Sequence, residues 1–203
     1  SNNFGRSLTS GDFNADGRTD LAVGAYGYST ITGRTYIFYN GSIITENASG
    51  ADIIITGETT SNSFGMSLTS GDFNADGKTD IAVGASYYSS FTGRAYIFYN
   101  GSIITENASG ADIIITGETT GDVFGTSLAS GDWNADGKTD LAVGAYQYST
   151  NTGRAYLFYN GSIITENASG ADIIITGETT DNYLGYTIGS GDWNADGKTD
   201  LVV

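Results

Sequence analysis

The sequence predicts an all-β chain made of β-propeller blades, each a four-stranded antiparallel sheet, with about 3.5 blades in its 203 residues. Three observations predict this fold class. A sequence pattern recurs with a 60-residue period, which is typical of a repeat architecture. Within each period, short runs of β-branched and aromatic residues are separated by turn residues, which indicates strands. No stretch carries an apolar stripe of useful length at helical spacing.

The repeat is clearest in two recurring strings. The pair Phe4-Gly5 returns as Phe64-Gly65, Phe124-Gly125 and Leu184-Gly185. A string of Ser, Gly, Asp, an aromatic residue, Asn, Ala, Asp, Gly, a basic residue, Thr and Asp occurs four times, beginning at Ser10, Ser70, Ser130 and Ser190. The predicted division is therefore a single propeller, or propeller segment, over 1–203, with repeat 1 at 1–60, repeat 2 at 61–120, repeat 3 at 121–180 and a partial repeat 4 at 181–203.

Four strands are expected in each repeat. In repeat 1 they are the segment from Phe4 to about Ser10, and the segments 19–24, 34–39 and 52–56. Each is short, rich in β-branched or aromatic residues, and bounded by turn residues such as Gly or Asn. Because a blade buries its faces only by stacking on neighbours, this pattern favours a propeller. A β-solenoid is the competing architecture, but its rungs are usually much shorter than this repeat.

Composition narrows the function classes. With 23 acidic and 8 basic residues the net charge is −15, so the chain should repel nucleic acid and anionic membrane surfaces and attract divalent cations. It contains no Cys and no His, which removes disulfides, thiolate metal sites and the usual general base. No apolar run approaches the length of a membrane span. The start at Ser1 is expected to be that of a mature or excised segment.

The recurring acidic loop has the composition of a calcium site. Asp12, Asn14, Asp16 and Asp20 place side-chain oxygens at loop positions 1, 3, 5 and 9, and Arg18 at position 7 would contribute its backbone carbonyl. A chain that wraps around a hard cation offers alternate residues inward, and all-oxygen ligands suit Ca²⁺ better than Mg²⁺. The same donors recur as Asp72, Asn74, Asp76, Lys78 and Asp80, as Asp132, Asn134, Asp136, Lys138 and Asp140, and as Asp192, Asn194, Asp196, Lys198 and Asp200.

These loops predict about four Ca²⁺ per chain, in a structural role. They hold 12 of the 23 acidic residues, and four ions would change the formal charge from −15 to −7. An EF-hand is excluded because Val23 stands where the bidentate Glu is needed and the flanking pattern is that of strands. The alternative is an Asx-rich turn without an ion, in which three carboxylates would repel one another. Since each loop commits its ligands to the ion, no nucleophile or base is left beside it.

Together these residues resemble the FG-GAP repeat of integrin α-subunit N-terminal β-propellers. The Phe4-Gly5 opening, the acidic loop and Val23-Gly24-Ala25 follow in the family's order. The resemblance implies four-stranded blades with Ca²⁺ in the loop between the first and second strands. It also implies ligand contacts on the opposite face, formed by the second-to-third and fourth-to-next-first connections. One departure is that Tyr26, Ser86 or Tyr146 replaces the proline that usually closes the third motif.

Differences between the repeats are concentrated in the connections that the resemblance assigns to the ligand-facing side. Loops on a rigid scaffold commonly carry binding, and tyrosines there suit a protein or glycan contact. Drift at exposed turns and packing between blades are the other interpretations. The candidate ligand-facing residues are Tyr26, Tyr28, Ile31, Tyr87, Tyr88, Phe91, Tyr146, Tyr148 and Asn151.

The favoured function is a calcium-stabilised, non-catalytic recognition, adhesion or scaffold module outside the cell or on its surface. Two alternatives remain: a glycan-binding lectin propeller, and an accessory domain of a secreted hydrolase. The lack of His and Cys argues against an enzyme. The expected partner is a protein or a glycan, not nucleic acid and not the membrane interior. Because an incomplete ring leaves exposed edges, the chain is expected to assemble with a second copy or to be part of a longer propeller.

Overall fold

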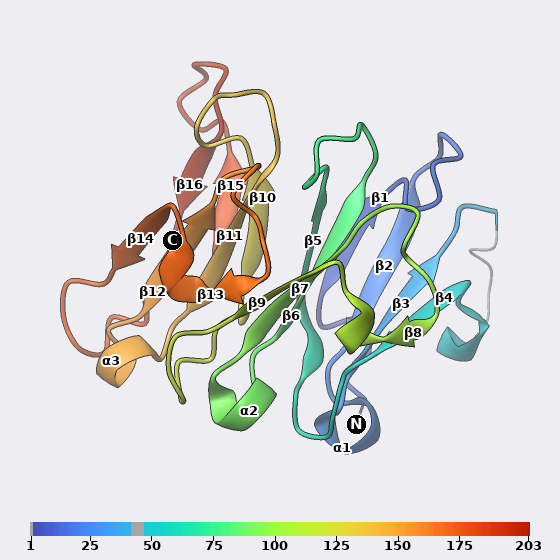
Figure 1. Ribbon diagram of the computed structural model, residues 1–203, viewed down its shortest axis with the longest axis horizontal. Coiled ribbons are helices and arrows are strands. Elements are labelled where there is room, and N and C mark those ends of the chain that lie inside the picture. The colour runs from blue at the N-terminus through green and yellow to red at the C-terminus, as the bar shows by residue number, and fades with distance from the viewer. Residues whose placement is uncertain (1, 42–46) are drawn as a thin grey trace.

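The computed structural model describes residues 2–41 and 47–203, which form successive antiparallel sheets connected in chain order. Figure 1 shows the sheets standing side by side along the longest axis of the molecule. The first sheet contains β1 (Leu8–Gly11), β2 (Asp20–Ala25), β3 (Arg34–Phe38) and β4 (Ile53–Thr56). The second contains β5 (Phe64–Gly71), β6 (Asp80–Ala85), β7 (Arg94–Phe98) and β9 (Ile113–Thr116). The third contains β10 (Leu128–Gly131), β11 (Asp140–Ala145), β12 (Arg154–Phe158) and β14 (Ile173–Thr176).

The remaining elements are short. A two-stranded ribbon of β15 (Gly189–Gly191) and β16 (Asp200–Val202) follows the third sheet. The single-turn elements are α1 (Tyr28–Ile31), α2 (Tyr88–Phe91) and α3 (Tyr148–Asn151), with 3₁₀ turns η1 (Ala48–Gly50), η2 (Ala108–Gly110) and η3 (Ala168–Gly170). In the described parts of the chain, no helix is long and apolar enough to cross a membrane. The all-β class and the antiparallel four-stranded sheets are therefore confirmed.

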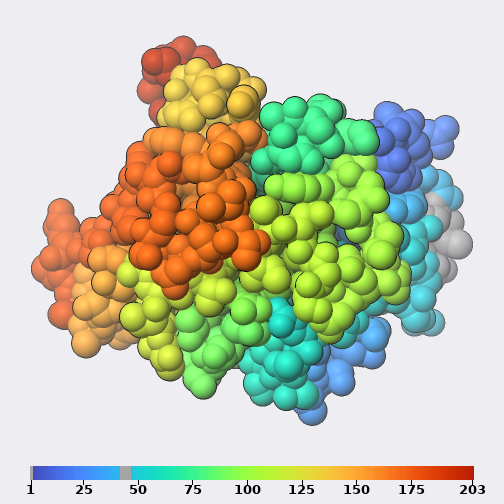
Figure 2. Space-filling view, in the orientation of Figure 1, coloured from blue at the N-terminus to red at the C-terminus, as the bar shows by residue number. Residues whose placement is uncertain are grey.

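Each of the first two sheets gains a short parallel strand that the sequence did not predict. β8 (Glu106–Asn107) pairs with the outer edge of β4, and β13 (Glu166–Asn167) pairs with β9. Each of these strands has only two paired residues, both polar, so the sequence shows no strand pattern there. The partner strand also belongs to the preceding repeat. Figure 2 shows the yellow-green and orange segments around these strands covering the near surface.

The first strand of repeat 1 is shorter than predicted. The expected strand begins at Phe4, whereas β1 begins at Leu8. In repeat 2 the strand does begin at the equivalent Phe64, which pairs with Ala85 across a bulge and forms a parallel bridge with Gly33 of the preceding repeat. The bridge to the preceding repeat recurs between Phe124 and Gly93, but the first strand of repeat 3 again begins later than predicted, at Leu128. Among the described strands, the predicted start is therefore confirmed in repeat 2 alone.

The core lies between successive sheets. Phe64 is fully buried between the first two sheets, and its ring meets those of Tyr96 and Phe98 edge-on, with centroids 5.5 and 6.4 Å apart. The sheets approach closely at Gly84, where an added Cβ would collide with the carbonyl oxygen of Gly125 in the next repeat. Repeats 2 and 3 thus use their opening phenylalanines, Phe64 and Phe124, to fill the junctions. A strand glycine in each of the first three repeats lets the next backbone approach.

The connections divide between two opposite ends of the sheets. The loops between β1 and β2, β5 and β6, β10 and β11, and β15 and β16 lie at one end, while α1, α2 and α3 lie at the other (Figure 1). This division follows from antiparallel order, because alternate connections in a meander return to the same end. It separates the two sets of candidate functional residues.

Candidate metal loops and the opposite loop face

Each acidic loop is wrapped by hydrogen bonds from its own backbone. In the second loop, the two carboxylate oxygens of Asp72 accept from the N–H groups of Asp76 and Gly77, at 3.0 and 2.8 Å. The side-chain oxygen of Asn74 accepts from Asp76 N–H at 2.9 Å, and Asp76 accepts from Lys78 N–H at 2.9 Å. The other three loops repeat all four bonds, with donor and acceptor within 3.1 Å of one another.

The last aspartate of the loop sits deeper than the others. Asp80 is fully buried, and its two carboxylate oxygens accept from the N–H groups of Phe73 and Asn100, at 2.9 and 2.8 Å. Burial raises the pKa of the Asp80 carboxyl to about 6; the two backbone hydrogen bonds oppose this shift, and the charges of Asp76 and Asp72 add to it. Burial also raises the pKa of the equivalent Asp140. Asp80 therefore links Phe73, at the start of the acidic loop, to Asn100, just after β7.

As they stand, the loop carboxylates do not converge. Within residues 2–41 and 47–203, no group of three or more Asp, Glu, His or Cys side chains is placed to hold a metal ion. The donor set nevertheless fits a hard cation, since it consists of carboxylate and amide oxygens on one tight turn. A carboxylate oxygen that accepts one N–H keeps a second lone pair for an ion. Left-handed φ values of 59° at Ala75 and 83° at Gly77 make the turn.

The acidic loops also touch the neighbouring repeat. The side-chain amide nitrogen of Asn100 donates to the backbone carbonyls of Asp12, in the first loop, and Thr79, at 3.0 and 3.3 Å. Asn160 makes the same pair of bonds one repeat later, at 3.2 Å each, to Asp72 and to Thr139. Asn100 therefore links the first loop to the second, and Asn160 links the second loop to the third.

At the opposite end, three of the candidate tyrosines are covered by arginines of their own repeat. The guanidinium carbons of Arg34, Arg94 and Arg154 lie 3.8, 3.7 and 3.6 Å from the ring centroids of Tyr28, Tyr88 and Tyr148. A cation over an aromatic face is an attractive contact that holds both groups in place. These rings therefore pack within their own repeat, which differs from the packing between blades that the sequence left open.

The other candidate positions differ between repeats. The rings of Tyr87 and Phe91 lie 4.8 Å apart, and Phe91 and Ile31 remain 47% and 41% exposed. Tyr26 is half-buried. In the third repeat Tyr146 packs against the rings of two tyrosines from the following segment, while the amide nitrogen of Asn151 donates to the Asp181 carboxylate at 3.0 Å. The structure brings Tyr87, Phe91 and Ile31 together and keeps the third-repeat residues in contacts of their own.

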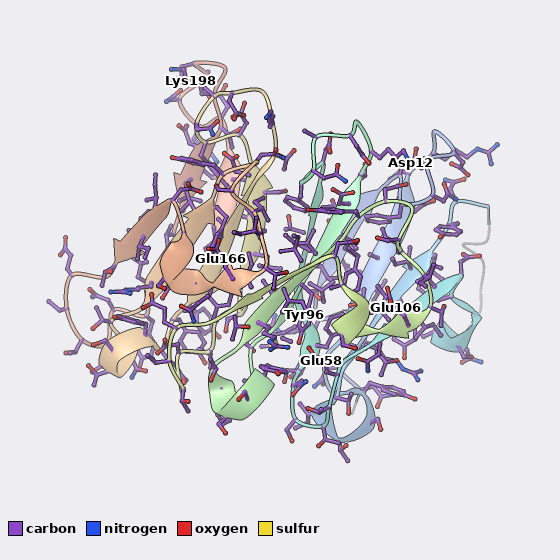
Figure 3. All side chains as sticks on the ribbon, in the orientation of Figure 1. Asp12, Glu58, Tyr96, Glu106, Glu166 and Lys198 are labelled. Carbon is purple, nitrogen blue, oxygen red and sulfur yellow. The ribbon has the colours of Figure 1, made fainter. Side chains whose placement is uncertain are left out.

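Sequence reasoning missed the ion pair that joins successive repeats. Glu58 accepts from Arg94 at 2.6 Å and from the hydroxyl of Tyr96 at 2.7 Å, and Figure 3 shows Glu58 and Tyr96 side by side. Glu118 repeats both contacts with Arg154 and Tyr156, at 2.7 and 2.9 Å. The available signal was the return of one glutamate, one arginine and one tyrosine at fixed positions in every repeat.

Four-stranded antiparallel sheets repeated every 60 residues, each with an Asp/Asn loop after its first strand, define a repeat protein of the blade-forming β class. The FG-GAP repeat pattern matches residues 4–38, 64–98 and 124–158, which together make up more than half of the chain. The chain belongs to the FG-GAP repeat family, as the sequence predicted.

The relatives include a phospholipase D and integrin α subunits. The chain is 34% identical over 205 residues to the phosphatidylinositol-glycan-specific phospholipase D of Homo sapiens, a match that covers 91% of this chain and 24% of that protein. It is 32% identical over 159 residues to integrin alpha-5 of Xenopus laevis, covering 70% of this chain and 14% of that protein. The chain thus spans about a quarter or less of the length of these relatives.

Proposed function

We propose that the chain is a calcium-stabilised, integrin-like β-propeller segment that acts as a non-catalytic recognition, adhesion or scaffold module. The observation that carries this proposal is the acidic loop. It occurs four times with the same donors and the same backbone wrapping, always at the same end of successive sheets. A fourfold repeated oxygen-donor loop suits a structural cation better than a single reaction centre.

In this proposal Asp72, Asn74, Asp76 and Asp80, with the backbone carbonyl of Lys78, hold one Ca²⁺. The corresponding residues of the other three loops hold one each. The ion supplies positive charge at a turn that otherwise collects three carboxylates, one of which is buried with a raised pKa. Asn100 and Asn160 connect neighbouring loops, so ion binding in one repeat also supports the next.

A location outside the cell suits this role. Calcium sites in extracellular modules have dissociation constants of about 10⁻⁴ to 10⁻³ M, which extracellular calcium can fill. The integrin match supports adhesion or recognition, and the phospholipase D match supports the alternative of an accessory domain beside a hydrolase. The repeat itself is compatible with both roles, since it occurs in both kinds of relative.

We further propose that the two end sheets are covered by another repeat of the same type, from a second copy or from the same polypeptide. Phe4 and Leu8 of repeat 1 are 50% and 59% exposed, whereas the equivalent Phe64 and Leu68 are buried at an internal junction. The end surface therefore has the chemistry of an interface. Solution mass decides between the sources: a multiple of the chain mass supports a second copy, and the mass of one chain at high concentration removes that source.

Calorimetric titration of calcium into chelator-treated protein tests the calcium proposal. The wild-type chain should take up about four ions, and Asp72→Ala should remove one of them, because a single loop loses its first carboxylate ligand. A matched control is Asp52→Ala, which removes an acidic residue outside the loops. Uptake of no calcium by the folded wild-type chain would overturn the proposal.

A further inference from the structure

A cavity of about 510 Å³ lies where the first two repeats meet, at the end of the sheets that carries α1 and α2. It is bounded by α1, by the connection from β4 to β5 and by α2. Among residues 2–41 and 47–203, no charged side chain lines it, although the chain as a whole carries a net charge of −15. Its lining consists of Ile31, Thr59, Thr60, Ser61, Asn62, Tyr87, Ser89, Ser90 and Phe91.

One part of the lining is apolar and accessible. Tyr87 and Phe91 form an aromatic pair with an interplanar angle of 60°. Phe91 and Ile31 are 47% and 41% exposed, so their apolar surface is left in contact with solvent. Exposed apolar groups gathered at a concave site are typical of ligand pockets.

The backbone conformation of Ile31 and Phe91 is energetically unfavourable for their residue types. Ile31 and Phe91 have φ values of 63° and 67°, in the left-handed region that β-branched and bulky residues avoid. The equivalent position in the third repeat is Asn151, with φ 61°, and asparagine tolerates this conformation. The first two repeats therefore keep an exposed apolar side chain at a strained position that a polar residue would occupy at less cost. Strain of this kind concentrates at functional sites.

The rest of the lining supplies neutral hydrogen-bonding groups. Hydroxyls come from three residues of the β4–β5 connection and two of α2. Asn62 is only 3% exposed, and its side-chain amide nitrogen has no hydrogen-bond partner among the described residues. Its side-chain oxygen already accepts from Thr59 at 3.0 Å. An unpaired buried donor carries a desolvation cost. Because this nitrogen is itself buried, a ligand oxygen satisfies it only after a small side-chain movement in the wall of the cavity.

The next junction along the chain lacks this chemistry. There the aromatic pair is replaced by Gln147 and Asn151, and Asp122 stands in place of Asn62. The Asn151 amide is engaged by Asp181 and by the hydroxyl of Tyr183, at 3.0 and 3.3 Å. The two junctions share a backbone but not a binding surface, which makes the second a natural control for the first.

From these features we infer that the cavity binds a neutral pyranose sugar. A pyranose ring offers an apolar face of C–H groups, which matches Phe91, Tyr87 and Ile31, and a rim of hydroxyls, which matches the neutral donors and acceptors. A charged ligand would find no partner in the lining. The inference rests on the recognition role proposed above and names its ligand class, but it does not depend on calcium in the loops at the opposite end.

Saturation-transfer NMR with the neutral methyl pyranosides of glucose, galactose, mannose and N-acetylglucosamine tests the inference. At least one sugar should receive saturation at its ring C–H protons. Phe91→Asn, which introduces the residue natural to the third repeat, should weaken binding about tenfold, since one aromatic contact is worth roughly a decade in affinity. Its melting temperature should stay equal or rise, because asparagine suits the left-handed backbone.

The control variant is Gln147→Ala at the second junction, which should leave sugar binding unchanged. Weaker transfer in Phe91→Asn than in wild type, at an equal or higher melting temperature, supports the site. No transfer to any of the four sugars, or equal transfer to wild type and Phe91→Asn, overturns it. Binding of calcium by a chain that binds no sugar would leave the calcium proposal standing, so the two failures are distinguishable.

Discussion

Replacing Phe64 by alanine should destabilise the chain far more than the same replacement at Phe4, although the two residues occupy the same position of their repeats. Phe64 is fully buried and has ring contacts with Tyr96 and Phe98, so its removal leaves a cavity and should cost about 3–5 kcal/mol. Phe4 is 50% exposed and has one ring contact, with Tyr36 at 5.6 Å. Its removal should cost about 1–1.5 kcal/mol, roughly half the value of a fully buried side chain.

The difference of about 1.5–4 kcal/mol corresponds to a melting-temperature gap of roughly 3–16 °C for a chain of this size. Circular dichroism melts of both variants measure it, at a concentration at which each sample has the mass of one chain. Equal shifts for the two variants would refute the idea that the opening aromatic residue acts by filling the junction with the preceding sheet.

Two further substitutions test the contacts between repeats. Glu118→Ala removes the acceptor shared by Arg154 and Tyr156, and it should lower the free energy of unfolding by about 1–3 kcal/mol in chemical denaturation. Its control is Glu178→Ala, because Glu178 has no ion pair among the described residues. The control should stay within about 0.5 kcal/mol of wild type. Equal losses would contradict the role given to the ion pair. Gly84→Ala forces a Cβ against the next repeat and should lower stability by about 1–3 kcal/mol or more, measured by the same unfolding curves; a neutral effect would mean that the sheets do not approach as described.

The local features of the chain could be predicted because they depend on adjacent residues. The strand from Arg34 to Phe38 follows from its β-branched and aromatic side chains, and the acidic loop follows from donors spaced two apart around a glycine. The prediction of the loop was strengthened because the same string occurs four times. The family followed from the order of these local motifs.

Contacts between repeats could not be predicted in this way. The pairing of Glu58 with Arg94 joins residues 36 apart, and the parallel pairing of β8 with β4 depends on how one sheet is placed against the next. The sequence period predicts that successive sheets stack, but it does not predict which residues of one sheet contact the next. The cavity beside Phe91 has the same origin, because it exists only where turns from two repeats meet.

Likewise, the tyrosines could not be sorted by sequence alone. Tyr87 and Tyr88 are neighbours in the chain, yet Tyr88 lies beneath Arg94 and Tyr87 faces Phe91 at the cavity. Residue type therefore predicted neither which of these tyrosines packs against an arginine nor which one lines the cavity.

The most direct test of a calcium-stabilised propeller segment is a thermal melt of the chain with saturating calcium and again with a calcium chelator. Each site filled at a hundred times its dissociation constant should contribute about 2.7 kcal/mol, so the loss of several ions should lower the melting temperature by many degrees. Magnesium in place of calcium should restore less of the loss, because the loop donors suit the larger ion. An identical melting temperature with and without the chelator would contradict the account.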